Sequence, residues 1–574
     1  MQFRQSLIAV CFVLFSGAGA PAQQFTISTF AGTGTQGYAD SAAKSAQFAF
    51  PGRLLFDSSG KLYIADGGNN RIRVISGGNV TTFAGNGTAG YSGDGSAATS
   101  AELNNPTGIA LDSSGNLYIA DSGNLVIRKI SGSTISTVAG ENSLGVGYSG
   151  DGAAATSAQM NDPTDVAVDS TGNIFIADAG NSVIREVTVA DGNIATVVGG
   201  PATTLQLSHP DAVVFDSKGV LYIADTGNRR IVKFANGVAS VVAGTGDLGW
   251  TGDGGSALDA SFADPMGFGL DAAGNIYIAD TFNGRVRKVS TDGIVTTIAG
   301  TGIQAYFGDG GTATEAGIFF PHDVATDSSG NVYVADTYNH VIRELVPTAP
   351  KLSANGAVNG ATFLPAISPG ALATVFGTGF SSQDVQGTLP LPLSLADVIV
   401  TVNGKAAPIL YITPLQINFQ VPWETQVGTA QITVTVSGRV SNQITVPVSI
   451  AAPGLFTTGG RAIAQNADLS LNSPSNPAKA GSIITVYATG SGPVNPAVKD
   501  GAASPNPAPL VTSSVSAKIG SEDATVKFAG LTSTYVGLLQ LNIEIPSGLA
   551  SGTYPLVITI AGESSKAANV SVTQ

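Results

Sequence analysis

Short apolar runs separated by turn-forming residues recur along the first two thirds of the chain. In one unit, residues 108–111 are apolar, an Asp-x-x-Gly turn follows, and residues 117–120 and 126–130 form two further runs. Runs this short, with Gly and Asp between them, are typical of antiparallel strands joined by tight turns. A fourth run ends in the pattern Ala-Gly, so each unit predicts a four-stranded sheet and the whole predicts an all-β fold.

The same unit occurs six times. Each copy contains Asp-x-x-Gly-x-φ-aromatic-φ-Ala-Asp, where φ is Ile, Leu or Val, and a Pro opens it. An Asn follows the second Asp by three residues in every copy, and an Arg follows it by seven in all but the fourth, which has Val232. Repeats of this length that cannot bury their apolar faces alone predict a six-bladed β-propeller over residues 23–347. The six motifs span residues 57–66, 112–121, 169–178, 216–225, 271–280 and 327–336.

The position of the fourth run indicates how the ring closes. One copy, at residues 27–32, precedes the first unit, whereas none follows the sixth unit, which ends near Leu345. We therefore expect residues 27–32 to pair with residues 341–345 and complete the last blade. This pairing would remove an open sheet edge.

The repeat resembles NHL-repeat propellers, especially bacterial forms that carry Gly-Asp-Gly loops. The resemblance covers residues 25–347 and implies the propeller fold. It says less about function, because the family includes ligand-binding scaffolds, sensor domains and a few metal-dependent lyases.

The remaining third of the chain follows a Pro-rich linker at residues 347–350. Two stretches of pattern Gln-φ-Asn-x-x-φ-Pro, at residues 416–422 and 540–546, each lie between alternating strand-like runs. They predict two immunoglobulin-like β-sandwiches, at residues 351–452 and 453–574, without a disulfide. With Ser368-Pro369-Gly370 and Ala452-Pro453-Gly454, this part resembles a duplicated C-terminal module of large secreted proteins from soil bacteria. The resemblance implies extracellular placement and no known chemistry.

Composition restricts the location and the partners. Residues 1–22 have the features of a signal peptide, with a short apolar run and the small residues Ala20 and Ala22 before a cleavage site that follows Ala22. The only cysteine, Cys11, lies inside it, so the mature chain would have no thiol chemistry. The net charge of −14 disfavours nucleic acid and anionic membranes as partners, and no later segment predicts a transmembrane helix. We expect a secreted, periplasmic or cell-surface protein.

Loops before the opening prolines carry the first candidate site. Four of them contain an aromatic residue and an Asp around Gly-Asp-Gly, a looser copy holds Tyr38 and Asp40, and the fourth blade lacks the motif. Strand order places these loops on one face, where aromatic rings and carboxylates would suit a glycan, a peptide or calcium. In the alternative interpretation, Asp94 or Ser96 caps a short helix and the ring packs. The candidate ligand-binding residues are Tyr91, Asp94, Tyr148, Asp151, Trp250, Asp253, Tyr306 and Asp309.

The beginnings of the inner strands carry a second candidate site. Asp165, Asp211, His322 and Asp323 all lie at or just after an opening proline, near the mouth of the central channel. Such a cluster would bind a divalent cation, whereas the alternative makes them solvated rim residues. The lyases of the resembling family use several His ligands, and this chain has only three His.

These patterns favour a recognition or scaffold protein over an enzyme. The chain has no nucleophile elbow, phosphate-binding loop or HExxH motif. We expect the long-loop face of the propeller to bind a glycan, a peptide or a protein. The one cofactor that the candidate residues would suit is a divalent cation. The alternative function is a metal-dependent lyase or hydrolase that acts at the channel mouth.

Overall fold

The computed structural model describes residues 25–200, 205–291, 293–381, 384–396, 398–436 and 438–574. The predicted signal peptide lies outside these residues. Contacts divide the chain into two compact units, one ending at Pro347 and one continuing from Thr348. None of the helices in the described ranges is long and apolar enough to cross a membrane.

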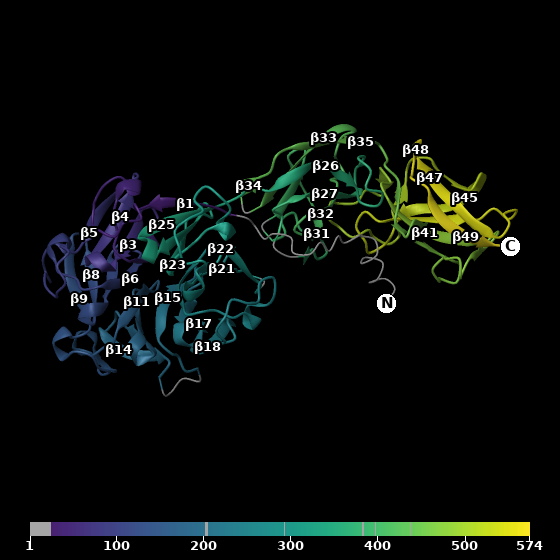
Figure 1. Ribbon diagram of the computed structural model, residues 1–574. Helices are drawn as coiled ribbons and strands as arrows, with labels where there is room; N and C mark the ends of the chain where they lie inside the picture. Colours follow the sequence, from purple (N-terminus) through teal and green to yellow (C-terminus); the bar gives the residue numbers. More distant parts are fainter. Residues whose placement is uncertain (1–24, 201–204, 292, 382–383, 397, 437) are drawn as a thin grey trace. The chain divides into compact units, whose positions relative to one another are not determined.

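Six antiparallel sheets build the first unit, and we number them as blades 1 to 6 in chain order (Figure 1). Blade 1 contains β2 (Pro51–Phe56), β3 (Leu62–Asp66), β4 (Arg71–Ser76) and β5 (Asn79–Ala84). Blade 2 contains β6 (Pro106–Leu111), β7 (Leu117–Asp121), β8 (Val126–Ser131) and β9 (Thr134–Ala139). Blade 3 contains β11 (Pro163–Val168), β12 (Ile174–Asp178), β13 (Val183–Val187), β14 (Asn193–Val198) and the short β10 (Ala153–Ala154).

The last three sheets have the same order. Blade 4 contains β15 (Pro210–Phe215), β16 (Leu221–Asp225), β17 (Arg230–Ala235) and β18 (Val238–Ala243). Blade 5 contains β19 (Pro265–Leu270), β20 (Ile276–Asp280), β21 (Arg285–Val289) and β22 (Val295–Ala299). Blade 6 contains β23 (Pro321–Thr326), β24 (Val332–Asp336), β25 (Val341–Pro347) and β1 (Phe25–Ala31).

The ring closes as predicted. Each of the inner strands β2, β6, β11, β15, β19 and β23 contacts the next, and β23 contacts β2. Strand β1 pairs with β25, with Ile27 opposite Leu345, and Figure 1 shows this purple strand beside the teal one. The all-β, six-sheet, propeller-like ring is confirmed, because the first strand supplies the partner that the last sheet lacks.

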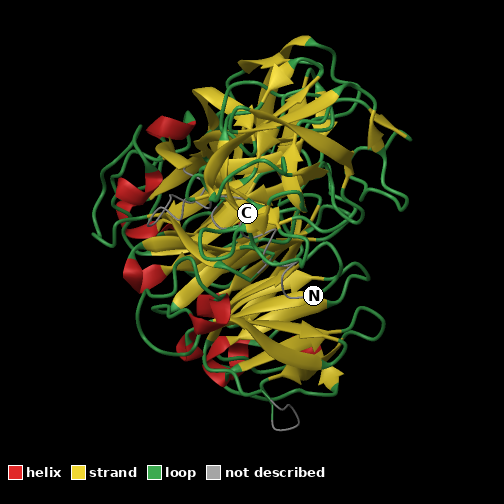
Figure 2. Cartoon of the chain, turned by 90° about the vertical axis from the view of Figure 1, so that its right-hand side faces the viewer, coloured by secondary structure: helices red, strands yellow, loops and turns green. Residues whose placement is uncertain are grey.

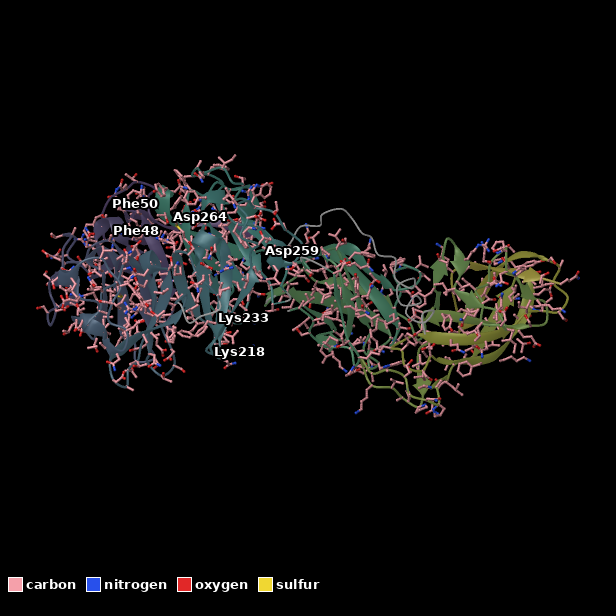
Figure 3. The ribbon with its side chains drawn as sticks, turned by 90° about the horizontal axis from the view of Figure 1, so that it is seen from below. Phe48, Phe50, Lys218, Lys233, Asp259 and Asp264 are labelled. Carbon is pink, nitrogen blue, oxygen red and sulfur yellow. The ribbon has the colours of Figure 1, made fainter. Side chains whose placement is uncertain are left out.

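One face of the ring receives all the long loops. In blade 1, Pro51 lies opposite Asp66 and Ile72 lies opposite Ala84, so the inner strand begins where the second strand ends and where the fourth strand ends. We call this the long-loop face and the other, which carries the Asp-x-x-Gly turns, the short-turn face. Figure 3 shows Phe50 and Asp264 on one side of the ring and Lys218 on the other.

Short 3₁₀ turns lie on the long-loop face, and most of them, drawn in red, lie along one side of the view in Figure 2. One set follows the second strand of every blade, and the other lies in the long loops. The first set is η2 (Gly67–Asn69), η4 (Ser122–Asn124), η7 (Ala179–Asn181), η8 (Thr226–Asn228), η10 (Thr281–Asn283) and η12 (Thr337–Asn339). The second set is η1 (Ala43–Ser45), η3 (Ala98–Ser100), η5 (Asn142–Leu144), η6 (Ala155–Ser157), η9 (Ala257–Asp259) and η11 (Ala313–Glu315).

The long loops also fill the wedges between blades. Ala98, Ala101 and Leu103 of the second loop are buried in one cluster with Ile72 of blade 1 and Ile119 of blade 2. Because neighbouring sheets diverge toward the outside of the ring, this small-residue segment supplies the apolar volume that the strands do not. The loops therefore stabilise the ring as well as covering its face.

The second unit begins with two sheets around one apolar core. Val375, Phe419, Val400, Ile432 and Val446 are all fully or almost fully buried in that core and come from both sheets. The first sheet contains β26 (Lys351–Asn359), β27 (Leu372–Thr378), β28 (Val385–Gln386), β31 (Ile409–Ile412) and β32 (Gln416–Gln420). The second contains β29 (Val398–Val402), β30 (Lys405–Ala407), β33 (Gly428–Val436), β34 (Arg439–Val440) and β35 (Ile444–Val448).

The remaining strands surround a second core. Strand β45 belongs to both of its layers. The longer strands are β41 (Ile483–Thr489), β44 (Val515–Ile519), β45 (Glu522–Leu531), β46 (Leu539–Glu544), β47 (Gly552–Ile560) and β49 (Ala568–Thr573). The two-residue strands are β36 (Gly454–Leu455), β37 (Thr457–Thr458), β38 (Arg461–Ala462), β39 (Ala464–Gln465), β40 (Ala478–Lys479), β42 (Val494–Asn495), β43 (Leu510–Val511) and β48 (Glu563–Ser564).

The two copies of the Gln-φ-Asn stretch make the same local contacts. In β32, the Gln416 amide donates to Asn418 Oδ1 at 2.8 Å, and in β46 the Gln540 amide donates to Asn542 Oδ1 at 3.0 Å. A threonine hydroxyl of the adjacent strand donates to each of these Asn side chains. The repeated sequence thus builds a repeated hydrogen-bond arrangement, while the immunoglobulin-like topology and the boundary at residues 452 and 453 stay predictions.

The two halves of the second unit share buried contacts. Leu372 of β27 packs with Phe456, Ile463 and Leu538, and its backbone N–H donates to Thr489 Oγ1 at 2.8 Å. A shared apolar cluster couples neighbouring sheets more tightly than a flexible linker does. The two halves therefore form one body.

Limited proteolysis of the full chain is expected to cut first between residues 347 and 351. The division into two compact units falls there, and neither unit needs the other to complete its own core. Mass spectrometry should find two resistant fragments, a propeller-like one and a C-terminal one that stays whole at residues 452 and 453. A first cut inside either fragment, or a single resistant body, would contradict this division.

Candidate functional site

The long-loop aspartates bind buried arginines. In blade 2, the Arg128 guanidinium is fully buried and lies 2.6 Å from Asp94 and 3.3 Å from Asp121. The Tyr91 ring lies over the Arg128 guanidinium, and Arg128 Cζ is 5.1 Å from the ring centroid. The Tyr91 hydroxyl is 2.9 Å from Thr137 Oγ1. Two carboxylates and an aromatic face thus replace water around the cation.

Four other blades repeat this arrangement, and blade 4, with Val232, lacks both the arginine and the loop aspartate. In blade 5 the aromatic residue, Trp250, lies over the neighbouring Arg285 instead, at 4.2 Å. The equivalent arginines and aspartates are Arg73 with Asp40 and Asp66, Arg185 with Asp151 and Asp178, Arg287 with Asp253 and Asp280, and Arg343 with Asp309 and Asp336.

The predicted loop site therefore has a structural role in every blade that carries it. The capping alternative is wrong for Asp94 and Ser96, because turn η3 begins after Ala97 and has no side-chain cap. The packing alternative agrees with the contact between the ring and the arginine. The rings remain 40–54% exposed, so a ligand role for Tyr91, Tyr148, Trp250 and Tyr306 stays a prediction.

Each Asp-x-x-Asn turn holds the loop that precedes its own blade. Asp121 Oδ1 accepts the Asn104 backbone N–H at 2.7 Å, and the Asn124 amide donates to Asp121 Oδ2 at 2.8 Å. Burial raises the pKa of Asp121 to about 6, against the opposing effect of these hydrogen bonds and of Arg128. These aspartates do not cap their own turns, because the Asp at each N-cap position makes no side-chain cap hydrogen bond. All six instead accept a backbone N–H two residues before the opening proline.

A buried arginine crosses the axis of the ring. Arg53, from the inner strand of blade 1, lies 2.8 Å from Asp323 of blade 6 and 3.2 Å from Asp165 of blade 3. The glycine at 108 makes room, because a Cβ there would lie 2.5 Å from the Asp165 carboxylate. A Cβ on Gly267 would lie as close to Asp323 Oδ1. We call Arg53, Asp165 and Asp323 the axial triad.

The axial triad bears on the predicted metal site. Asp165 and Asp323 bind Arg53, and Asp211 lies 3.1 Å from His209 Nδ1. Burial lowers the pKa of His322, and the nearby charges of Asp211 and Asp323 oppose that effect. Among the described residues, no three His, Cys, Asp or Glu side chains come together as a metal site. A metal role for Asp165, Asp211, His322 and Asp323 stays a prediction that this geometry does not favour.

Stability is expected to fall as the pH rises through about 7. Asp165 and Asp323 share one cation, and burial raises the pKa of both, that of Asp165 to about 7. Because the folded state holds a proton that the unfolded state releases near pH 4, folding is favoured below the raised pKa. Urea unfolding should give a free energy about 1–3 kcal/mol higher at pH 5 than at pH 8. Asp165→Asn should reduce this difference, and an equal pH dependence in both proteins would contradict the assignment.

A second group of aromatic side chains lies nearer the axis on the long-loop face. Phe282 contacts Phe320, Phe320 contacts Tyr338, and Tyr338 contacts Phe50, with ring centroids 4.8–5.4 Å apart. Phe50 then contacts the His340 ring at 4.9 Å. These five residues, which we call the aromatic strip, come from blades 5, 6 and 1. Phe50, Phe282 and Tyr338 are 38–49% exposed.

The strip occupies positions that the other blades fill differently. Phe282 and Tyr338 replace the Gly of the Asp-x-Gly-Asn turn found in blades 1 to 4. Phe50 and Phe320 precede their opening prolines with φ of 54° and 57°, in the left-handed region. The equivalent residues are Asn, Asp or His, and Asn and Asp tolerate that region better than Phe. The shared motifs do not reveal the strip, because its residues stand where blades 5, 6 and 1 differ from the other blades. A comparison of the blades position by position would have revealed them.

The short-turn face has a pocket of its own. It lies between blades 3 and 4, holds about 520 Å³, and has Phe175, Phe215 and Phe234 among its lining residues. Asp169, Asp216 and other residues of two Asp-x-x-Gly turns surround it.

Comparison with protein families identifies the repeat. The model of the teneurin NHL domain matches residues 84–148 and 237–307, and the NHL-repeat model matches residues 160–185 and 320–344. Teneurin-1 of Gallus gallus is 34% identical in an alignment of 117 residues that covers 18% of this chain and 4% of that protein. The chain thus spans only a small part of this curated relative.

Several solved structures match part of the chain at low identity. A Bacteroides thetaiotaomicron protein of unknown function has 20% identity and a TM-score of 0.44, and the match covers 57% of this chain and 76% of that protein's chain. An auxiliary nutrient binding protein of the same species has 16% identity and a TM-score of 0.42 over the same shares. A streptogramin B lyase has 13% identity and a TM-score of 0.37, and the match covers 57% of this chain and the whole of the lyase chain. The matched families show that the first unit contains NHL repeats in a propeller-like fold.

Proposed function

We propose that this chain is an extracellular or cell-surface recognition protein that binds a glycan, a peptide or a protein through the long-loop face of its propeller. The aromatic strip is the observation that supports this proposal. Exposed apolar groups that lie together on a rigid scaffold mark interaction sites, whereas single exposed ones do not. The strip lies on turns fixed by buried hydrogen bonds, so its rings are held in place before binding.

Backbone strain supports the same interpretation. A Phe in the left-handed region costs about 1–2 kcal/mol relative to ordinary backbone. The four other blades avoid this cost with Asn105, Asp162, His209 and Asp264. Phe50 is exposed and Phe320 is half-buried, and aromatic rings that accept this strain in two adjacent blades contribute to something other than stability.

We do not propose the lyase or hydrolase alternative for this chain, because the axial triad engages two of its four predicted metal ligands. The C-terminal unit has no candidate chemistry among its described residues and would position or attach the propeller.

Restoring the residues of the other blades is expected to abolish binding and leave the fold intact. The variant carries Phe50→Asn, Phe320→Asn, Phe282→Gly and Tyr338→Gly. Its melting temperature should equal or exceed that of the natural chain, since Asn relieves the left-handed strain at residues 50 and 320. Both proteins would be applied to arrays of glycans and of peptides.

A matched control carries Tyr91→Phe, Tyr148→Phe and Tyr306→Phe, which changes the loop rings on the same face. We expect this control to bind the array components that the natural chain binds, and the strip variant to lose them by at least tenfold. Equal binding by the strip variant, or loss only in the loop control, would overturn the proposal.

A further inference from the structure

The backbone of the aromatic strip restricts what chain can lie on it. The Phe50 N–H donates to His340 Nδ1 at 3.3 Å, the Phe282 N–H to the Ala263 carbonyl at 3.1 Å, and the Tyr338 N–H to the Phe319 carbonyl at 3.2 Å. An extended peptide gains affinity mainly by pairing its main chain with free backbone groups of the receptor. Three strip residues have no free N–H to offer such a peptide.

The side chains of the strip offer a different set of contacts. No hydrogen bond to the Tyr338 hydroxyl occurs among the described residues, and none there involves His340 Nε2. Burial lowers the pKa of His340, so its ring is neutral near pH 7. Because Nδ1 accepts the Phe50 N–H, the neutral ring carries its proton on Nε2 and can donate it. The strip therefore combines aromatic faces with one hydroxyl and one N–H donor.

These contacts match the chemistry of a sugar chain. A pyranose ring has apolar C–H faces that pack on aromatic rings and hydroxyl groups at its edges that both donate and accept hydrogen bonds. The strip runs across three blades, so it fits several consecutive sugar units better than a single one. The formal net charge of −14 disfavours polyanionic glycans.

Resting on the proposed function, we infer that the ligand of the aromatic strip is a neutral oligosaccharide or polysaccharide chain. Its pyranose faces pack on Phe282, Phe320 and Phe50. Its hydroxyl groups bond the Tyr338 hydroxyl and His340 Nε2.

Affinity electrophoresis of the full mature chain would test this inference. Native gels would contain one neutral soluble polysaccharide each: a cellulose derivative, a xylan, a mannan, a β-glucan or a dextran. We expect at least one gel to retard the protein, with little change in 0.5 M NaCl, because the contacts are uncharged. The strip variant should lose the retardation, and Tyr338→Phe should weaken it several-fold while leaving the melting temperature unchanged.

The outcomes separate the inference from the proposed function. Retardation by no polysaccharide, together with strip-dependent binding on the peptide array, would overturn the inference and leave the proposed function standing. Polysaccharide binding that the strip variant retains in full would overturn both. Salt-sensitive retardation would indicate charge attraction and would also overturn the inference.

Discussion

Removal of residues 23–33 is expected to open the ring and cause aggregation or a large fall in melting temperature. The deletion takes away β1, leaving β25 with an unpaired edge that can pair with another copy. It also exposes apolar surface now covered by Phe25 and Ile27, which are 2% and 1% exposed. Differential scanning calorimetry and light scattering would measure both effects. An unchanged melting curve would show that the ring closes elsewhere.

Single substitutions in β1 provide a matched control. Ile27 is buried and its neighbour Thr26 is exposed in the same strand. Ile27→Ala should lower the free energy of unfolding by about 2–5 kcal/mol, and Thr26→Ala should change it by less than about 0.5 kcal/mol. Equal effects would contradict the observed register.

Replacing Arg53 with Met is expected to destabilise the protein by about 3–5 kcal/mol. The change leaves Asp165 and Asp323 buried without a counter-ion, although the side-chain volume is nearly kept. Denaturant unfolding at pH 7.5 would measure the loss.

Adding Asp165→Asn and Asp323→Asn to Arg53→Met should recover part of this stability, because the buried charges are then gone. A triple variant no more stable than Arg53→Met, or an Arg53→Met protein as stable as the natural chain, would contradict the charge argument. The first result would indicate a role of Arg53 in packing alone.

The repeat made the propeller predictable from the sequence. Apolar runs and Asp-x-x-Gly turns at regular spacing determine four strands per blade, and the displaced run at residues 27–32 determined the closure. The presence of Asp121 and its equivalents in every blade indicated a structural role, although they hold the preceding loop and do not cap their own turns. These features depend on local spacing, which a sequence shows directly.

Side-chain contacts between residues far apart in the sequence were harder to predict. The sequence shows that blade 4 lacks both the Gly-Asp-Gly loop and the Arg, and this joint loss could have indicated that Asp94 pairs with Arg128. The axial triad joins residues 53, 165 and 323 and has no local pattern at all. The aromatic strip depends on which blades are neighbours after closure, so Phe50 and Tyr338, far apart in sequence, meet only in the folded ring.

Hydrogen–deuterium exchange of the full chain shows directly whether the ligand binds at the aromatic strip. It would be measured with and without the polysaccharide that retards the protein most. We expect slower exchange at residues 50–52, 282–284, 319–321 and 338–340, with little change at the pocket of residues 168–170 and 215–221. Protection confined to that pocket or to the loop residues 91–95 and 148–152, or its absence from the propeller, would show that the ligand does not bind at the aromatic strip.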